Sequence, residues 1–177
     1  AADPPAQITV HADQPGADTD GPKPTSAEQF YNRLGQRLIH MITARTPAGI
    51  LYEVDMRLRP DGNKGMLVRS LAAYADYQAT AAWTWEHQAL IRARPVAGDP
   101  GLAARFAAVR RATICRPRDP AQLREDVRAM RQRMRETLDK GGRGRFDLKQ
   151  GRGGIADIEF MVQYSVLRWA AAHPALA

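Results

Sequence analysis

Cysteine is almost absent from this chain of 177 residues, in which Cys115 is the only example. A single cysteine excludes an internal disulfide and is typical of proteins kept in a reducing cytoplasm. The sequence also lacks an apolar run long enough to span a membrane, and it lacks an N-terminal signal segment. We therefore predict a soluble, cytoplasmic protein with no membrane partner.

The two ends of the chain are also unusual. It begins with Ala1 rather than methionine and stops at Ala177, directly after an expected helix, so we expect a fragment of a longer protein. Residues 1–24 are rich in Pro, Asp, Gly and Ala and show neither helical nor strand periodicity. This composition predicts a flexible loop.

The chain is basic, with a formal net charge of +7, and 44% of its residues are hydrophobic. This composition allows a packed core and indicates an acidic partner, such as nucleotide phosphates, nucleic acid or an acidic protein. The arginines between residues 121 and 140 alternate with acidic residues, which is typical of a solvated helix face. Because they form no continuous basic tract, we predict no nucleic-acid partner.

The stretch ILYEVDMRLRP, residues 50–60, has the period of a strand. Glu53, Asp55 and Arg57 would share one side of that strand, although scattered polar residues are also usual on the solvent side of a half-buried strand. A hairpin should follow, with residues 66–68 as its second strand. The opposite side of the first strand should contact a core through Tyr52, Val54, Met56 and Leu58.

Helix signals mark most of the remaining chain. Thr25 with Glu28 predicts one helix start, followed by an apolar stripe that includes Phe30, Leu34 and Leu38. Ser70 can cap a second helix. Asp119 followed by Pro120 predicts the start of a long helix with the stripe Leu123, Val127, Met130, Met134 and Leu138. The last helix, through Trp169, is apolar nearly all round and should be buried.

Residues 82–94, AWTWEHQALIRAR, combine large aromatic and charged side chains. Residues 89–96 fit either a helix or a strand, and a strand would place Arg92 and Arg94 on one side. We expect Trp83 and Trp85 to pack in a core rather than stack on a base. His87 has no second His or Cys nearby, so a metal site there is not expected.

A glycine-rich turn precedes the last helix in FDLKQGRGGIADIEF, residues 146–160. Such a turn can bind an anion, but acidic residues in the first helical turn already satisfy the helix dipole and repel phosphate. We favour a structural turn that docks the helical region on the rest, with Lys149 and Arg152 as exceptions that could face a cleft. The cleft or docking candidates are Glu86, Lys149, Gly153, Gly154, Asp157 and Glu159.

Three blocks together resemble the bacterial glutamine synthetase adenylyltransferase family, from about residue 28 to the C-terminus. They are YEVDMRLRPDGNKGMLV (52–68), AWTWEHQALIRARPVAGD (82–99) and FDLKQGRGGIADIEFMVQY (146–164). Family members have one half that attaches AMP and one that removes it, and residues 83–90 are more similar to the attaching, C-terminal half. The resemblance implies an α+β fold, with a partial polymerase-β-like nucleotidyltransferase palm at residues 25–98 and a truncated helical domain at 99–177.

The resemblance also implies a function. In this family, ATP donates AMP to a tyrosine of glutamine synthetase, Mg²⁺ is required, and the PII signalling protein and glutamine regulate the reaction. The alternative is a non-catalytic helical module that binds glutamine synthetase or the PII protein. Basic side chains should hold the phosphates, and the candidates are Arg57, Arg59, Arg92 and Arg94. Arg57 could equally pair with the acids on its side of the strand, and Arg92 and Arg94 could pair with Glu86 and Asp55.

Asp55 resembles the third carboxylate of such palms, which binds metal or takes the proton from the tyrosine hydroxyl. Glu53 is a weaker candidate for a metal ligand, and a surface or salt-bridge role is favoured for it. These palms also need a Gly-Ser turn and an Asp-x-Asp strand before that carboxylate. Asp18 and Asp20 do not supply the strand, because glycines flank them in a loop. We therefore predict no detectable AMP transfer by this chain alone.

Overall fold

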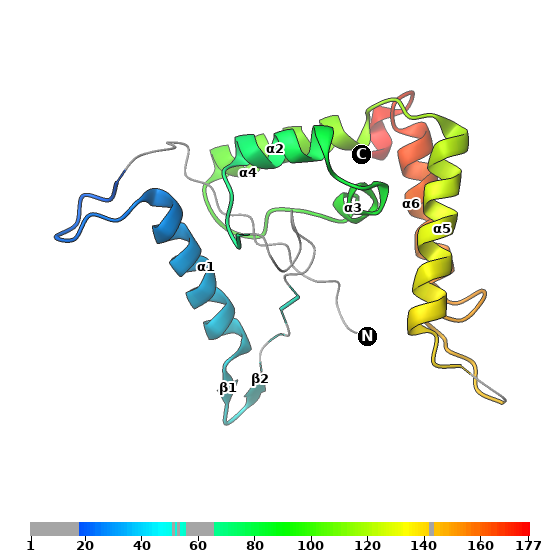
Figure 1. The fold of residues 1–177 in the computed structure, drawn as a ribbon, viewed down its shortest axis with the longest axis horizontal. Coiled ribbons are helices and arrows are strands. Elements are labelled where there is room, and N and C mark those ends of the chain that lie inside the picture. The colour runs from blue at the N-terminus through cyan, green and yellow to red at the C-terminus, as the bar shows by residue number, and fades with distance from the viewer. Residues whose placement is uncertain (1–17, 51, 53, 56–65, 142–143) are drawn as a thin grey trace. The chain divides into compact units, whose positions relative to one another are not determined.

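The computed structural model (Figure 1) describes most of the chain, namely residues 18–50, 52, 54–55, 66–141 and 144–177. The chain forms two compact units, Ala1–Ala81 and Ala82–Ala177. The described residues are mostly helical, with one small two-stranded sheet. No helix among them is both long and apolar enough to cross a membrane. The expected boundary after residue 98 concerns the domains of a family fold and stays a prediction.

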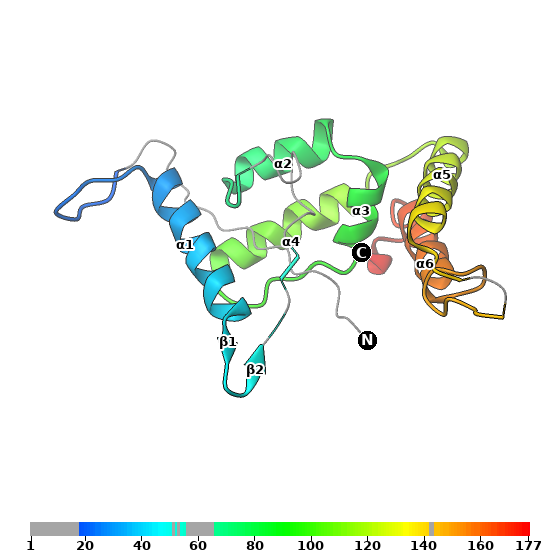
Figure 2. The ribbon, with the colours of Figure 1, turned by 60° about the horizontal axis from the view of Figure 1, so that its bottom comes forward.

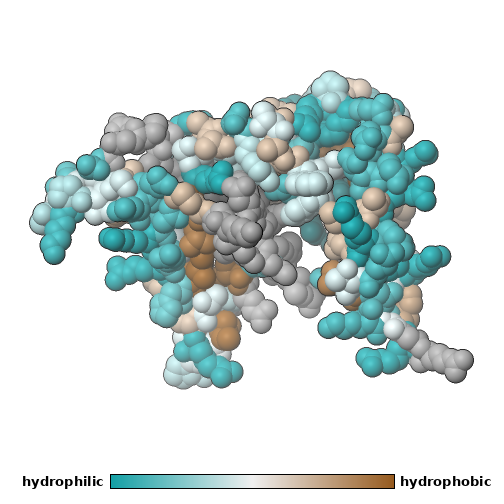
Figure 3. Space-filling model, viewed as in Figure 1, coloured by the Kyte–Doolittle hydropathy of each residue, from teal (hydrophilic) through white to brown (hydrophobic). Residues whose placement is uncertain are grey.

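The first unit contains helix α1 (Ala27–Thr43), which begins one residue later than expected. Ser26 is its cap, because the Ser26 hydroxyl accepts a hydrogen bond from the N–H of Gln29 at 3.3 Å. The expected cap, Thr25, instead donates its hydroxyl to the carbonyl of Lys23 at 3.3 Å. Figure 3 shows hydrophobic side chains along one side of α1, where Phe30 and Met41 are 46% and 71% exposed. The apolar stripe therefore exists but is only partly covered.

Residues 66–68 do not form the expected strand. The N–H of Val68 instead donates to the side-chain oxygen of Asn32 in α1 at 3.3 Å. Gly35, which is buried, leaves room for this contact, because a Cβ atom there would lie 3.1 Å from a methyl group of Val68. A side-chain hydrogen bond to α1 thus replaces the strand pairing that the sequence suggested.

The sheet lies earlier in the chain than expected. Strands β1 (Arg45–Thr46) and β2 (Gly49–Ile50) pair antiparallel, and Gly49 has a φ of 108°, which glycine adopts without strain. The strand expected over residues 50–60 is wrong for its described members, because only Ile50 belongs to a strand. Tyr52, expected in a core, is 60% exposed. The other residues of the expected strand, 51, 53 and 56–60, lie outside the described part.

Helix α2 (Leu71–Thr80) closes the first unit. Its predicted cap is confirmed, because the hydroxyl of Ser70 accepts a hydrogen bond from the N–H of Ala73 at 3.2 Å. Leu71 and Tyr74 are buried on one side of this helix.

The second unit consists of α3 (Thr84–Leu90), α4 (Pro100–Ile114), α5 (Pro120–Leu138), α6 (Ile155–Trp169) and a short 3-10 helix, η2 (Pro174–Leu176). Helices α5 and α6 lie side by side, and α3 contacts both of them (Figures 1 and 2). The predicted start of α5 is confirmed, since the Asp119 carboxylate accepts from the N–H of Gln122 at 2.7 Å. The buried apolar residues of this unit are Leu90, Ile114, Leu123, Val127, Ala156, Leu167 and Ala170.

The strand alternative for residues 89–96 is wrong, because α3 continues to Leu90 and no strand follows. The guanidinium of Arg110 in α4 caps the C-terminal end of α3, because it donates to the carbonyls of Leu90 and Ile91 at 2.8 and 2.5 Å. Trp83, expected in a core, is 66% exposed. Its backbone N–H donates to the Glu86 carboxylate at 2.8 Å, so Trp83 occupies the cap position at the N-terminal start of α3.

The last helix, which is apolar nearly all round and expected to be buried against another element, is buried on one side only. Gln163 and Leu167 are buried, but Ile158, Met161 and Val162 are each more than half exposed. The buried side contacts α3 and α5, and the amide of Gln88 in α3 donates to that of Gln163 at 3.1 Å. One side of α6 is therefore used for packing, while the other presents apolar side chains to solvent.

A half-buried arginine, Arg118, lies in the loop between α4 and α5 and contacts the end of α4. The guanidinium of Arg118 donates to the carbonyls of Thr113 and Ile114 at 2.6 and 2.8 Å, which satisfies the C-terminal end of α4. Burial lowers the pKa of Arg118 to about 10, with a further lowering by the charge of Arg116. Arg118 thus stays charged at neutral pH and acts as a cap for the helix end.

Candidate functional site

The main predicted site residue, Asp55, lies in the first unit, half-buried and outside any helix or strand. Glu53, Arg57 and Arg59 lie outside the described residues. Within the part of the chain that is described, no three His, Cys, Asp or Glu side chains form a group able to hold a metal ion. A carboxylate suits Mg²⁺ in kind, but this one alone does not form a magnesium site. The roles of these four residues therefore stay predictions.

The second unit holds a glycine-rich turn between α5 and α6 that is organised around Asp147. One carboxylate oxygen of Asp147 accepts from the N–H groups of Gln150 and Lys149, at 2.8 and 2.9 Å. The other accepts from the N–H of Lys140 at 3.3 Å. The N–H of Gln150, followed by those of Lys140 and Lys149, holds the pKa of Asp147 below its ordinary value. Asp147 thus ties both ends of this turn to one side chain.

The N–H groups where α6 begins are occupied within the turn. Gly154 donates to the carbonyl of Gly151 and Ile155 to that of Leu148, each at 3.0 Å. Gly153 has a φ of 79°, and its N–H donates to the Asp157 carboxylate at 2.7 Å. These donors are consequently not free to bind an anion, which agrees with a structural turn. Docking by this turn stays a prediction.

Gly154 is one of the turn glycines at which two backbone segments approach closely. A Cβ atom there would lie 2.7 Å from the carbonyl oxygen of Leu148 and 2.9 Å from that of Gly151. Such distances are shorter than van der Waals contact, so a larger residue would force the backbone apart. The glycine is therefore required by the geometry of this turn.

Arg131 of α5 links the turn to both helices. Its side chain is 8% exposed, and its Nε donates to the Asp157 carboxylate at 2.6 Å. Its two terminal nitrogens donate to the side-chain and backbone oxygens of Gln150, at 3.2 and 2.8 Å. Arg135 donates to the same Asp157 oxygen at 3.0 Å. We call Arg131, Arg135, Gln150 and Asp157 the arginine clamp.

The prediction that Arg131 lies on a solvated helix face is wrong. Arg124, Arg128 and Arg133 of the same helix are exposed, as expected. A signal for Arg131 was present, because it follows Leu123 and Val127 at steps of four residues and so continues the buried stripe. An arginine at such a position requires an acidic partner, which the half-buried Asp157 supplies.

Asp157 is ionised more readily than an ordinary aspartate. Burial alone would raise the pKa of Asp157, but the Gly153 N–H and the guanidinium groups of Arg131 and Arg135 outweigh it and lower the pKa. A carboxylate that is only 22% exposed and accepts these bonds stabilises the folded chain in its charged form.

The lowered pKa of Asp157 predicts a loss of stability in acid. This stabilisation is complete above the unfolded-state pKa of about 3.9 and disappears as the pH falls through the lower folded-state pKa. The difference in free energy of unfolding between the unmodified chain and Asp157→Asn should therefore be largest near neutral pH and shrink below about pH 4. Urea unfolding at several pH values measures it. A difference that is independent of pH would contradict the assignment.

The other charged residues predicted for the site differ in whether they have a partner. Arg92 donates to Glu159 at 2.8 Å, a partner that the sequence reasoning did not consider, and both side chains are well exposed. Glu86 is buried in the first turn of α3, where its carboxylate accepts the hydrogen bond from the N–H of Trp83. Lys149 and Arg152 are exposed, and neither forms an ion pair with another described residue. Within residues 147–154, these are the two exposed cations.

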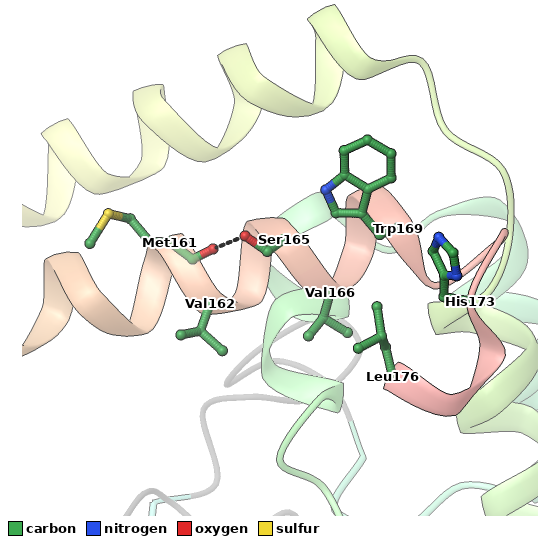
Figure 4. Close-up of a pocket in the computed structure, with 7 residues that line it drawn as sticks. All are labelled: Met161, Val162, Ser165, Val166, Trp169, His173 and Leu176. Atoms are coloured by element: carbon green, nitrogen blue, oxygen red, sulfur yellow. Dashed lines mark hydrogen bonds between the residues drawn. The ribbon is translucent and has the colours of Figure 1, made fainter.

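The solvent side of α6 contains a groove of about 530 Å³, shown in Figure 4. The hydroxyl of Ser165 donates to the carbonyl of Met161 at 2.9 Å and so is already occupied. In Figure 4, His173 and Leu176 from the segment after α6 lie at the same end of the groove as Val166 and Trp169, away from Met161. The groove can accept an apolar side chain, since it is lined by Met161, Val162, Ser165, Val166, Trp169, His173 and Leu176.

Comparison with known proteins identifies relatives along nearly the whole chain. The family model for glutamate-ammonia ligase adenylyltransferase matches residues 7–109, and that for PII-uridylyltransferase matches residues 122–176. A bifunctional glutamine synthetase adenylyltransferase/adenylyl-removing enzyme of Nitrosococcus oceani is 58% identical over 170 residues, and one of Pseudomonas aeruginosa is 50% identical over 181. Each alignment covers 96% of this chain and 18% of the relative, so the chain spans less than a fifth of their length.

Proposed function

The chain belongs to the glutamate-ammonia ligase adenylyltransferase family, and from this premise we propose that it forms part of an enzyme that transfers AMP from ATP to a tyrosine of glutamine synthetase. The observation that carries this proposal is the 58% identity to the Nitrosococcus oceani enzyme over 170 residues. The name of that relative also includes adenylyl removal. The whole protein would therefore both attach AMP to glutamine synthetase and remove it.

The reaction requires three events at one phosphorus atom. The tyrosine oxygen bonds to the α-phosphorus of ATP, the bond to pyrophosphate breaks, and the tyrosine proton passes to a base. We assign Asp55 as that base or as one ligand of Mg²⁺. When bound, Mg²⁺ would offset negative charge on the phosphates, but the described residues do not form its site by themselves. Arg57, Arg59, Arg92 and Arg94 are the proposed phosphate-binding residues.

The proposed fold places this chemistry on a polymerase-β-like palm within residues 25–98, followed by a helical domain from residue 99. The helices α4 to α6 fit the second part of this proposal. We further propose that the enzyme acts in the cytoplasm and that the PII protein and glutamine regulate it, as the family resemblance implies.

A chimera tests this function directly. In the Nitrosococcus oceani enzyme, the segment that matches this chain is replaced by residues 1–177, and the product is incubated with ATP, Mg²⁺ and unmodified glutamine synthetase. Mass spectrometry should detect a synthetase heavier by one AMP group. The 177-residue chain alone should give no adduct, because no Asp-x-Asp strand precedes Asp55 in it. An inactive chimera, or an active isolated chain, would contradict the proposal.

The apolar groove on α6 favours one alternative, a non-catalytic module that binds glutamine synthetase or the PII protein. If the groove binds a protein, Val162→Asp should abolish retention of the purified chain on immobilised glutamine synthetase or PII, because a charge would enter an apolar contact. Glu125→Ala, a change at an exposed residue of α5, is the control. Equal retention of both variants, or none of the unmodified chain, would exclude this alternative.

A further inference from the structure

The arginine clamp lies entirely within residues 122–176, the part that matches the PII-uridylyltransferase family model. The same residues also align with the glutamine synthetase adenylyltransferases, whose match covers 96% of the chain. The two names differ in the nucleotide that is transferred and in the protein that receives it. The two transferase names share the transfer of a nucleotidyl group, for which the proposed function uses a nucleoside triphosphate as donor. A segment common to both should therefore serve the phosphates rather than the base or the target protein.

The arginine clamp forms hydrogen bonds to the residues next to two exposed cations, Lys149 and Arg152. Arg131 donates to the backbone and side-chain oxygens of Gln150, which lies between Lys149 and the turn glycine Gly151. Through Asp157 it also reaches the N–H of Gly153, the residue after Arg152. The positions of Lys149 and Arg152 thus depend on a side chain that is itself buried and cannot contact a ligand.

We propose that Arg131 is a positioning residue for nucleotide transfer: it fixes the turn 147–154 so that Lys149 and Arg152 contact the phosphates of ATP. The inference rests on the proposed function. In this proposal the side-chain cations of the turn bind the phosphates. The N–H groups at the start of α6 do not, because they are occupied within the turn.

The kinetic test uses the chimera, with KM measured separately for ATP and for glutamine synthetase. Arg131→Met should raise KM for ATP about tenfold, the size of one lost charge-assisted hydrogen bond, and leave KM for glutamine synthetase unchanged. Arg131→Lys, which keeps the charge but not the planar fork, should give a smaller rise. Arg133→Met on the exposed face of α5 is the matched control and should change neither constant.

A coupling measurement separates positioning from general structural damage. Lys149→Met with Arg152→Met should raise KM for ATP by itself, and adding Arg131→Met should then cause little further change. Additive effects, or an unchanged KM for ATP in Arg131→Lys and Arg131→Met, would overturn the inference. An unmodified chimera without activity would overturn the proposed function as well, whereas an active chimera with additive variants overturns only the role of Arg131.

Discussion

Replacing Asp55 with alanine in the chimera should lower AMP transfer by about 10³-fold, the effect expected when a general base or metal-binding carboxylate is lost from a site. The expectation has a physical reason. A tyrosine hydroxyl is a weak nucleophile at neutral pH, and it needs either a base to take its proton or a metal ion that a carboxylate holds. Initial rates of AMP incorporation into glutamine synthetase measure the effect.

The fold should survive this change. Asp55 is half-buried and lies outside the helices and strands, so its removal should leave the helical circular dichroism of the chimera unchanged. Asp76→Ala is the matched control, because Asp76 is an exposed carboxylate of α2 in the same unit, and this variant should keep full activity. Near-normal transfer by Asp55→Ala would remove this residue from the site.

Arg131→Met should lower the free energy of unfolding of the 177-residue chain by about 3–5 kcal/mol, the range measured when one partner of a buried ion pair is removed. The change removes one of the two guanidinium groups that neutralise the Asp157 carboxylate. It also removes the guanidinium donors of the two Gln150 oxygens. Since domains are typically stable by about 5–15 kcal/mol, this loss is a large share of the total. Urea unfolding followed by circular dichroism measures it.

Two further variants make this prediction specific to the clamp. Arg133→Met changes an exposed arginine of the same helix and should shift the free energy of unfolding by less than about 0.5 kcal/mol. Asp157→Asn should destabilise the chain, and the double variant with Arg131→Met should lose less than the sum of the two single losses. If Arg131→Met were as mild as Arg133→Met, the clamp would not be the contact that holds α5, the turn and α6 together.

Short-range features were predictable from the sequence. Ser70 and Asp119 cap the helices expected of them, and Leu123 and Val127 lie on the predicted buried side of α5. These features depend on residues within one or two helical turns, which a periodic pattern records directly. The family resemblance, carried by three blocks in order, was confirmed by the match of residues 7–109 and by the identity to the curated relatives.

Burial was less predictable, because it depends on which segment covers which side of an element. Trp83 and Tyr52 have the composition of core residues but are exposed, and the period-two pattern after Ile50 does not continue as a strand at Tyr52, Val54 or Asp55. A short hairpin between β1 and β2 forms instead, since its two strands are neighbours in the chain.

For the candidate site, the sequence by itself determined the family, the residue types and the glycine turn before α6. Only the tertiary structure decided that Arg131 is buried and paired, because its partner Asp157 lies 26 positions further along the chain. Among several arginines on one helix, the choice of the buried one depends on where a distant carboxylate is placed. Packing of α6 against α5 sets that position, and no local pattern of the sequence contains it.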